Sequence, residues 1–515
     1  MNNLLFGVLS IVFCGIGYFF SWKYWKNDNY KIALLLLIIC GFILRVYTSF
    51  DFFLHPWDER YHALVAKNLM QHPLLPTLYN NPILPNNYKD WTASYVWLHK
   101  QPLPLWTIAT SMYLFGVNEI ALRIPSIIFT TLGIWITFYI GRYFFNKKVG
   151  YLTAFFYSIN GLIIEITAGR VATDHTDVFF LFFIELAVFF SILFIQKRKT
   201  IYTVFTSLSI GAAILSKWLP ALIVLPIWLL LVIDSGSFKP KAIAFQFTLL
   251  VVITFAAFFP WQLYIYSHFP LEAAWENGFN FKHFTQVLEK QTGSFNYFID
   301  RMRINYGELI YLPVLWFLWK TYKEKNNLKR WAICIWVLIP VIFFSFAKTK
   351  MQAYILFVAP ALFIMIADFY FMLKDYKKTH GFKWLINVVL LLLLVLPIRY
   401  MLERVKPFET ENRSPQWVIN LKQINERKIK KGIIFNYDKP IEAMFYTNLT
   451  AYNILPEKGL LQKLIRQGYF VIIDDTGNIP EDIKLIKGIY LEKLSLKTFS
   501  VQNSAQDKHD EPVHH

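Results

Sequence analysis

Long apolar runs, separated by short polar segments, dominate roughly the first 400 residues of the chain. The runs at about 3–22, 31–50, 121–143 and 177–196 are each close to the roughly 20 apolar residues that a helix needs to span a bilayer. Counting all such runs predicts about twelve transmembrane helices. We therefore expect residues 1–402 to form a polytopic α-helical membrane domain.

The pattern changes at about residue 403, where the composition becomes that of a soluble domain. Buried strands are predicted at residues 431–437 and 469–475, and helices at residues 440–447 and 457–468, so that strand and helix alternate. Such an alternation favours a small α/β domain, which we place at residues 403–501. The polar tail, residues 502–515, is expected to be disordered.

Lysine and arginine residues gather in the short segments between the apolar runs, and this distribution predicts how the helices are oriented. All basic segments fall on the cytoplasmic side only if Pro102–Phe115 lies along the outer surface as a short helix. The predicted external segments are then loops 51–116 and 268–305 and the C-terminal domain. We expect a multi-pass protein of a bacterial-type cytoplasmic (inner) membrane, with these segments on its periplasmic side.

Composition supports a membrane protein and argues against two other classes. Of the 515 residues, 56% are hydrophobic and 18% aromatic, far more than a soluble surface tolerates. The net charge of +18 would fit nucleic-acid binding, but its placement between apolar runs is typical of membrane topology signals instead. Cys14, Cys40 and Cys334 all lie within apolar runs, which argues against a disulfide framework or a thiolate metal site.

The segment from Asp51 to Trp106 is too polar to cross hydrocarbon, so we interpret it as a catalytic loop at the membrane surface. A carboxylate there, in Asp58-Glu59, can act as a base or hold a metal ion or a hydroxyl; a solvated loop end is an equally good interpretation. From the residues alone, Glu59 and Arg60 are interpreted as orienting groups that pair locally. Asp174 offers a second carboxylate, although it also fits a helix N-cap. Whether Asp58 and Asp174 hold a divalent metal stays open, and no other cofactor is indicated.

Cationic side chains gather on the same predicted side of the membrane. Lys100 either binds a phosphate as a point charge or simply extends its ammonium to the interface. Lys217 interrupts an apolar run, so it marks an outer turn or meets an anion within the bundle. Cations converging with two carboxylate sites suggest an anionic headgroup as ligand, with phosphate the first choice.

Several motifs, in order over roughly residues 50–365, resemble one family of membrane enzymes. WDERYHALVAKNLM resembles the Asp-Glu signature in the first external loop of the GT-C class of polyprenyl-phosphate-sugar glycosyltransferases. The branch it resembles contains the lipid A aminoarabinose transferase and the protein O-mannosyltransferases. Further segments similar to motifs of this class are HKQPL, FGVNEIALRIPS, RVATD, ILSKW and FSFAKTKMQAYILFVAP.

The resemblance implies a GT-C-like fold and an inverting transfer of a sugar from a polyprenyl phosphate to a glycolipid (lipid A-like), glycan or protein. Asp58 would be the principal catalytic carboxylate, with Asp174 as the second and Glu59 beside it. The residues expected to bind the donor phosphate or sugar are Arg60, Tyr61, Lys100, Lys217, His283, Lys348, Lys350 and Tyr354. No nucleic acid is expected as a partner.

Two departures from the family pattern bear on the phosphate site: Gln101 stands at a family proline and Trp218 at a family glycine. Two alternatives to an enzyme are a transporter and a non-catalytic scaffold. A transporter or lipid flippase would be expected to show two related halves with broken helices, and no such repeat is evident. A non-catalytic scaffold would not require carboxylates and cations to share one side of the membrane.

Overall fold

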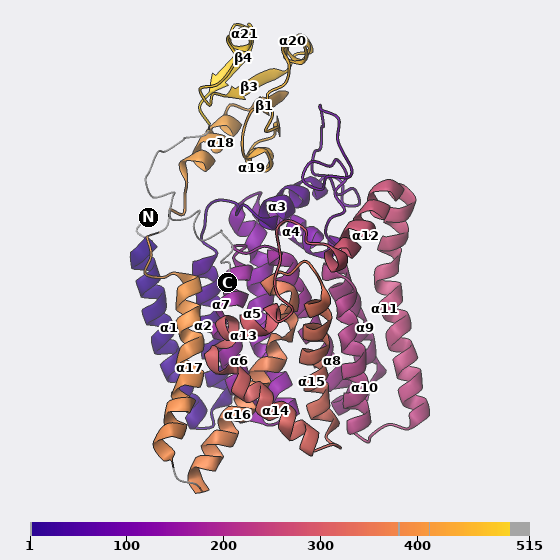
Figure 1. Ribbon diagram of the computed structural model, residues 1–515, viewed down its shortest axis with the longest axis vertical. Coiled ribbons are helices and arrows are strands. Elements are labelled where there is room, and N and C mark those ends of the chain that lie inside the picture. The colour runs from indigo at the N-terminus through magenta and orange to yellow at the C-terminus, as the bar shows by residue number, and fades with distance from the viewer. Residues whose placement is uncertain (1–2, 380–381, 411, 495–515) are drawn as a thin grey trace. The chain divides into compact units, whose positions relative to one another are not determined.

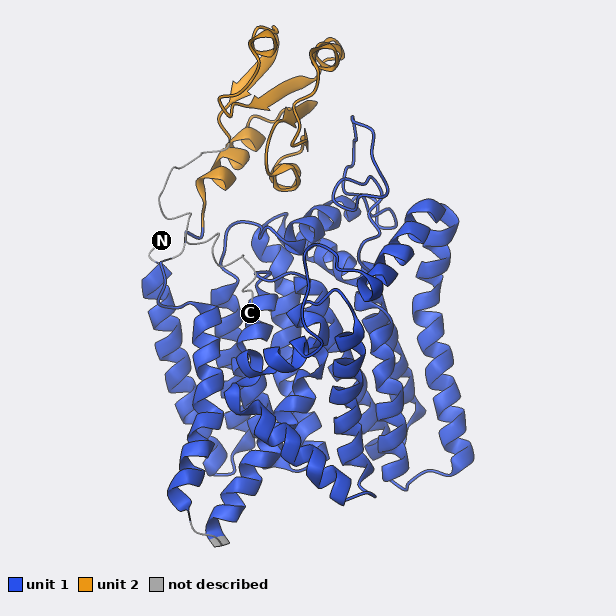
Figure 2. Cartoon of the chain, viewed as in Figure 1, with its two compact units in different colours: residues 1–413 blue, residues 414–515 orange. Residues whose placement is uncertain are grey.

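The chain forms two compact units, Met1–Arg413 and Ser414–His515, in a computed structural model (Figure 2). The structure describes residues 3–379, 382–410 and 412–494. The tail that we expected to be disordered, residues 502–515, lies outside the described residues.

Within its described residues, the regular elements of the first unit are helices, which loops connect (Figure 1). Its α-helices are α1 (Asn3–Lys26), α2 (Tyr30–Thr48), α3 (Asp58–Leu69), α4 (Pro102–Phe115), α5 (Glu119–Phe144), α6 (Lys147–Ile159), α7 (Gly161–Thr167), α8 (Asp174–Lys197), α9 (Thr200–Lys217), α10 (Val224–Asp234), α11 (Pro240–His268), α12 (Pro270–Thr285), α13 (Tyr297–Tyr306), α14 (Tyr311–Lys323), α15 (Leu328–Phe346), α16 (Ala359–Thr379) and α17 (Lys383–Val405). Short 3₁₀ helices, η1 (Leu219–Ile223), η2 (Glu308–Ile310) and η3 (Gln352–Val358), precede α10, α14 and α16.

Nine helices within the described residues are long and apolar enough to cross a membrane, which makes the chain a multi-pass membrane protein. A tenth span results if α6 and α7 count together, although they meet at an angle of 50°. Asn160 explains this bend, because its side chain accepts a hydrogen bond from Ile163 N (3.0 Å) and so starts a new helix. The sequence prediction of about twelve spans also included shorter apolar segments, such as Leu219–Asp234, that do not reach spanning length.

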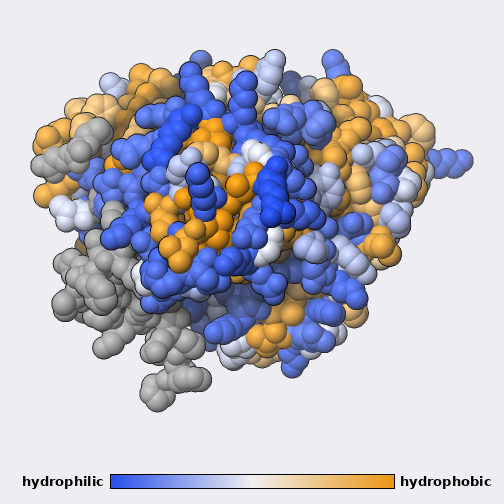
Figure 3. Space-filling model, turned by 90° about the horizontal axis from the view of Figure 1, so that it is seen from above, coloured by the Kyte–Doolittle hydropathy of each residue, from blue (hydrophilic) through white to orange (hydrophobic). Residues whose placement is uncertain are grey.

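The bundle has a packed centre and an apolar periphery. In the most apolar part of α8, 78% of the residues are buried, whereas the corresponding shares of α1 and α11 are only 17%. These outer helices expose large apolar side chains such as Phe19 (66%) and Phe245 (63%). Viewed from above, hydrophilic residues cover much of the visible face, and hydrophobic ones show both at its margin and near its centre (Figure 3). Apolar exposure on this scale indicates contact with lipid.

Helix α4 confirms the prediction of a short helix at Pro102–Phe115. Pro102 occupies the start of the helix, where a missing N–H costs nothing, and Gly116 ends it with a positive φ of 85°. Helix α4 packs against α3 and α5, so that Ile108 and Met112 are buried while Tyr113 is 75% exposed. In Figure 1, α3 and α4 lie at one end of the bundle and α14 lies toward the other.

The second unit contains a four-stranded parallel sheet in the order β2-β1-β3-β4. Its elements are α18 (Gln416–Glu426), β1 (Gly432–Phe435), α19 (Pro440–Tyr446), β2 (Thr450–Ala451), α20 (Lys458–Arg466), β3 (Phe470–Asp474), α21 (Glu481–Lys484) and β4 (Ile489–Glu492). The two strands and two helices expected from the sequence lie at β1, α19, α20 and β3. The edge strands β2 and β4 are too short or too exposed to give a clear apolar pattern.

The packing of α1 can be tested at two of its glycines. A Cβ at Gly7 would lie 2.0 Å from the carbonyl oxygen of Pro407, whereas a Cβ at Gly15 would meet nothing within 4 Å. We expect Gly7→Ala to destabilise the protein by about 1–3 kcal/mol, as overpacking does, and to lower its Tm in detergent. Gly15→Ala is the matched control and should leave Tm unchanged or slightly raised. Equal Tm values for the two variants would contradict the close approach of α1 to Pro407.

Candidate functional site

The first external loop is fixed to the bundle by a buried ion pair between Glu59 and Arg123. Arg123 donates from Nε to Glu59 Oε1 (2.7 Å) and from Nη2 to Glu59 Oε2 (2.9 Å), and both side chains are fully buried. Arg123 also donates to the carbonyl oxygens of Ser49 (2.9 Å) and Phe53 (2.8 Å). Burial by itself raises the pKa of Glu59, but Arg123, His55 and His175 together outweigh it and hold the pKa well below its usual range. Glu59 therefore fastens the loop and is not exposed to a substrate in this structure.

A second set of charges supports this clamp from the same loop. His55 lies between two carboxylates, with Nδ1 2.6 Å from Glu59 Oε2 and Nε2 3.2 Å from Asp51 Oδ2. Asp51 also accepts from Arg170 Nε (2.8 Å), in the turn before α8. Sequence reasoning assigned no role to His55 or Arg170. The sequence does contain one signal for the role of His55: it is four residues from Asp51 on one side and four from Glu59 on the other.

Asp58 is the first residue of α3, and two groups from distant segments reach its Oδ2. Lys100 Nζ lies 3.1 Å away, and the backbone N–H of Thr173 donates to it over 2.9 Å. The Asp58 side chain is 14% exposed and that of Lys100 is 18% exposed. The two ends of the first external loop thus meet at the start of α8, and the carboxylate remains partly accessible.

This contact fixes the charge state of both partners. Burial raises the pKa of Asp58, but Lys100 and the imidazoles of His62 and His99 outweigh it and lower the pKa below its usual range. Burial likewise lowers the pKa of Lys100, and attraction to Asp58 reverses the effect and raises it. At neutral pH the pair is therefore an aspartate and an ammonium.

Thr173 connects the Asp58–Lys100 pair to a second ion pair, Asp177–Lys217. Its hydroxyl donates to Asp177, whose other oxygen accepts from Lys217 Nζ. The Lys217 ammonium lies over the ring of Tyr354, 4.8 Å from its centroid. Residues from loop 51–116, α8, α9 and η3 therefore form one continuous polar cluster. We call Asp58, Lys100, Thr173, Asp177, Lys217 and Tyr354 the lysine–aspartate cluster.

Asp174 lies beside this cluster but is fully buried. Its Oδ1 is 2.8 Å from His62 Nδ1, on α3, and also accepts from the backbone N–H of His175. The side chains of His62 and Asp174 are 1% and 0% exposed. Asp174 is therefore close to Asp58 in the fold but, unlike Asp58, is shielded from solvent.

The second external loop meets the first through a hydrogen bond and aromatic contacts. His99 Nδ1 lies 3.2 Å from Glu276 Oε2, on α12, and the His99 ring stacks on Trp91 with centroids 4.4 Å apart. Tyr61 packs against Trp91 (4.9 Å), and Arg60 lies over the Tyr61 ring (5.0 Å). These two predicted donor-binding residues thus belong to an aromatic group beside the lysine–aspartate cluster.

The remaining predicted residues lie where the turn 347–351 meets the second loop. The backbone N–H of Thr349 donates to the His283 carbonyl (2.9 Å), and that of Lys348 to the Phe284 carbonyl (3.3 Å). Burial, with the charges of Lys100 and His99 close by, lowers the pKa of His283. Lys350 Nζ donates to the carbonyl oxygens of Ser345 (3.0 Å) and Ala347, so it closes the end of α15. This contact gives Lys350 a structural role that the sequence did not indicate.

No group of three or more His, Cys, Asp or Glu side chains suited to a metal ion occurs among the described residues. The lysines that pair with Asp58 and Asp177 occupy the positions where a cation would be needed. Asp58 and Asp177, each paired with a lysine, therefore do not form a metal site as they are arranged here.

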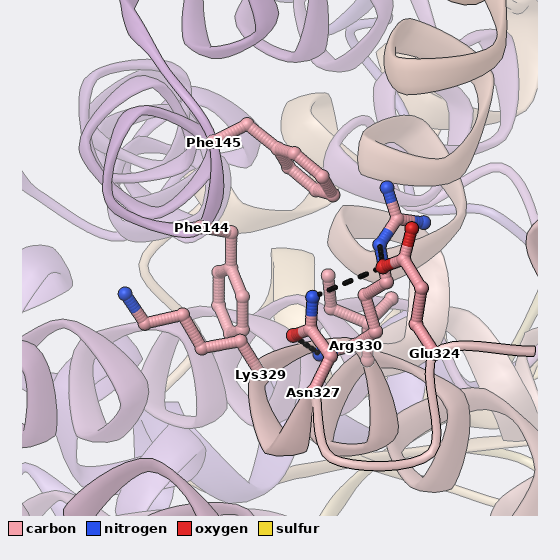
Figure 4. Close-up of a pocket in the computed structure, with 7 residues that line it drawn as sticks. Phe144, Phe145, Glu324, Asn327, Lys329 and Arg330 are labelled. Atoms are coloured by element: carbon pink, nitrogen blue, oxygen red, sulfur yellow. Dashed lines mark hydrogen bonds and ion pairs between the residues drawn. The ribbon is translucent and has the colours of Figure 1, made fainter. Parts of the chain in front are cut away.

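A cavity of about 310 Å³ lies at the ends of α5 and α15 and contains none of the predicted site residues (Figure 4). Its lining includes Phe145, Glu324 and Arg330, and Arg330 packs over the Phe145 ring (5.0 Å). Arg330 also pairs with Glu324 (3.2 Å) and Asp368 (2.9 Å), so its charge is compensated within the protein. This cavity offers no reactive group comparable to the lysine–aspartate cluster.

Loss of Arg123 should destabilise the protein, because it would leave the Glu59 carboxylate buried without its main partner. We expect Arg123→Leu to cost about 3–5 kcal/mol, measured as a large decrease of Tm in detergent. Arg142→Leu, at the exposed end of the same helix, is the control and should have a small effect. Similar Tm values for the two variants would be incompatible with the clamp.

Sequence comparison links the chain to one family and to relatives of lower identity. The sequence model of the dolichyl-phosphate-mannose-protein mannosyltransferase family matches residues 99–263, which include Lys100, Asp174 and Lys217. An undecaprenyl phosphate-alpha-4-amino-4-deoxy-L-arabinose arabinosyl transferase of Pseudomonas savastanoi pv. phaseolicola is 22% identical over 298 residues, 54% of this chain and 53% of that protein. The chain spans only a little over half the length of the curated relatives that it matches.

Solved structures of similar fold cover more of the chain. ArnT from Cupriavidus metallidurans, crystallised with undecaprenyl phosphate, matches with a TM-score of 0.58 at 17% identity, over 84% of this chain and 87% of its own. The archaeal oligosaccharyltransferase AglB from Archaeoglobus fulgidus, in complex with an inhibitory peptide and a dolichol-phosphate, matches with a TM-score of 0.53 at 13% identity, over 84% and 65%. The chain thus has the fold of the GT-C glycosyltransferases, and the resemblance predicted from its motifs is confirmed.

Proposed function

We propose that the chain is an inverting glycosyltransferase that moves a sugar from a polyprenyl-phosphate donor to an acceptor at the outer face of the cytoplasmic membrane. One observation carries the proposal: Lys100 and the start of α8 converge on Asp58, in the loop with the family signature. Two lysines and a partly accessible carboxylate then lie within one cluster. These are the groups that transfer from a phosphate leaving group requires.

In the proposed reaction, an acceptor hydroxyl attacks the anomeric carbon on the face opposite the phosphate. The new C–O bond forms as the bond from the anomeric carbon to the phosphate oxygen breaks, so the configuration inverts. Asp58 accepts the hydroxyl proton, and the phosphate departs with the bonding electrons. A phosphate is a stable leaving group, so the reaction needs no strong acid beside it.

The lysines would contribute most in the transition state. Negative charge on the phosphate grows as the glycosidic bond breaks, and fixed ammonium groups stabilise that charge more than they stabilise the ground state. Lys100 also affects the pKa of Asp58, because the two side chains are paired in this structure. A donor phosphate that draws Lys100 away would remove the main attraction that lowers the Asp58 pKa, and so make Asp58 a better base.

The membrane side follows from the charges of the connecting segments. Placing the basic segments in the cytoplasm puts Asp58, the second external loop and the second unit on the periplasmic side. The polyprenyl phosphates bound to ArnT and AglB are consistent with a donor of that chemical class here. For the acceptor we retain a glycolipid, a glycan or a protein.

Replacing Asp58 tests the proposed base. Asp58→Asn keeps the size of the side chain but cannot take a proton, so kcat should fall roughly 10²–10⁴-fold. The assay uses full-length protein in vesicles with polyprenyl-phosphate sugars and envelope extract, and measures sugar transfer. Asp90→Asn, a turn residue of the same loop, is the control and should stay near wild type. Undiminished transfer by a correctly folded Asp58→Asn protein would remove this role of Asp58.

Replacing Lys100 tests the phosphate contact. Lys100→Met should lower kcat/KM for the donor roughly 10- to 100-fold, the value of a charged hydrogen bond. Without Lys100 the pKa of Asp58 rises, so the acid limb of the pH–rate profile should move to higher pH. Lys89→Met, at an exposed position of the same loop, is the matched control. An unchanged acid limb would show that Lys100 does not set the charge of the catalytic base.

A further inference from the structure

We propose that His62 is a positioning residue, which joins α3 to α8 through Asp174 and so holds Asp58 in its place beside Lys100. The inference rests on the proposed function and adds a residue whose role no family motif specifies. It also changes the role of Asp174, from a group that contacts substrate to one that acts through His62.

The geometry follows from helix periodicity. Asp58 and His62 are four residues apart on α3, so their side chains lie on the same face of that helix. Asp58 accepts from the backbone N–H of Thr173 (2.9 Å), and His62 pairs with the next residue, Asp174 (2.8 Å). Two contacts, one helical turn apart on α3, therefore hold it to two consecutive residues at the start of α8.

The direction of the His62 hydrogen bond is determined by its partner. A carboxylate can only accept, so His62 Nδ1 carries the hydrogen and donates it to Asp174 Oδ1. In the described residues, neither His62 Nε2 nor Asp174 Oδ2 has a hydrogen-bond partner, and both atoms are inaccessible. The His62 ring packs edge-on against Trp97, which is 1% exposed.

Burial separates this role from catalysis. A substrate that contacts Asp58 meets a side chain that is 14% exposed, whereas His62 and Asp174 present almost no surface. The His62–Asp174 pair therefore does not contact the substrate, and it acts on the reaction through Asp58, whose place it fixes. Displacing a reactive group by about 1 Å can lower a rate roughly 100-fold, which is a measurable effect.

Three substitutions of His62 separate positioning from the alternatives. The amide nitrogen of asparagine can occupy the place of Nδ1, whereas that of glutamine corresponds to Nε2, and leucine offers neither donor. We expect His62→Leu and His62→Gln to lower kcat roughly 100-fold, with the donor KM within about threefold of wild type. His62→Asn should retain kcat within about tenfold of wild type. The measurement is steady-state sugar transfer by full-length protein in vesicles.

The controls guard against simple loss of folding. His72→Asn, at an exposed histidine after α3, should match wild type. Asparagine and glutamine are similarly polar, so their comparison decides the question even where His62→Leu fails to fold. In a double-mutant cycle, Asp174→Ala combined with His62→Leu should lose no more activity than the worse single variant, because both remove the same contact.

The possible failures can be told apart. Equal kcat for His62→Asn and His62→Gln, a wild-type kcat for all three variants, or a loss expressed only in KM would each overturn the positioning role while leaving the glycosyltransferase intact. Absence of transfer by the wild-type protein with every polyprenyl-phosphate sugar would overturn the proposed function, and the positioning role would fall with it.

Discussion

The arrangement of the site depends on one buried ion pair, Glu59–Arg123. An external loop that rests on a membrane bundle has many polar groups and little water to satisfy them, so its charges must be paired within the protein. Arg123 meets this constraint by donating to the Glu59 carboxylate from Nε and Nη2, and to the carbonyl oxygens of Ser49 and Phe53 from Nη1 and Nη2. A planar guanidinium can make all these contacts at once, which a lysine could not. The start of α3 is thereby fixed on α5, and Asp58, one residue before Glu59, has a defined place.

The lysine–aspartate cluster is then a consequence of compensated charge. Each lysine of the lysine–aspartate cluster has an aspartate as partner: Lys100 with Asp58 and Lys217 with Asp177. Unpaired ammonium groups at this depth would be costly, and so would unpaired carboxylates. A phosphate entering such a site meets lysines that are already desolvated and placed. Its binding must therefore redistribute hydrogen bonds between aspartate and phosphate, which couples the charge state of Asp58 to donor binding in the proposed reaction.

Much of this could be predicted from sequence, and the failures have clear causes. Pro102–Phe115 was predicted with its final bounds because prolines, length and the sidedness of the basic segments all agree. The charge of Lys217 within an apolar run predicted either an outer turn or a buried anion, and both occur, since α9 ends there and Asp177 pairs with it. The partner of His62 could not be found, because Asp174 is 112 positions away and no local pattern links them. The predicted count of about twelve spans stays a prediction: nine described helices reach spanning length, and short apolar segments and the bent α6–α7 pair account for the difference.

Backbone strain supports the importance of the same cluster independently of its charges. Thr173 has a φ of 65° and Trp218 a φ of 90°, in the region that β-branched and bulky residues normally avoid. These residues immediately precede Asp174 and follow Lys217, respectively. At Thr173 the conformation has a visible use, since its N–H reaches Asp58 while its hydroxyl reaches Asp177. Strain of this kind persists only where surrounding contacts enforce it, and it is concentrated at functional sites. A glycine at position 173 would relieve the strain but lose the hydroxyl, so threonine at this turn is explained by the two aspartates that it connects.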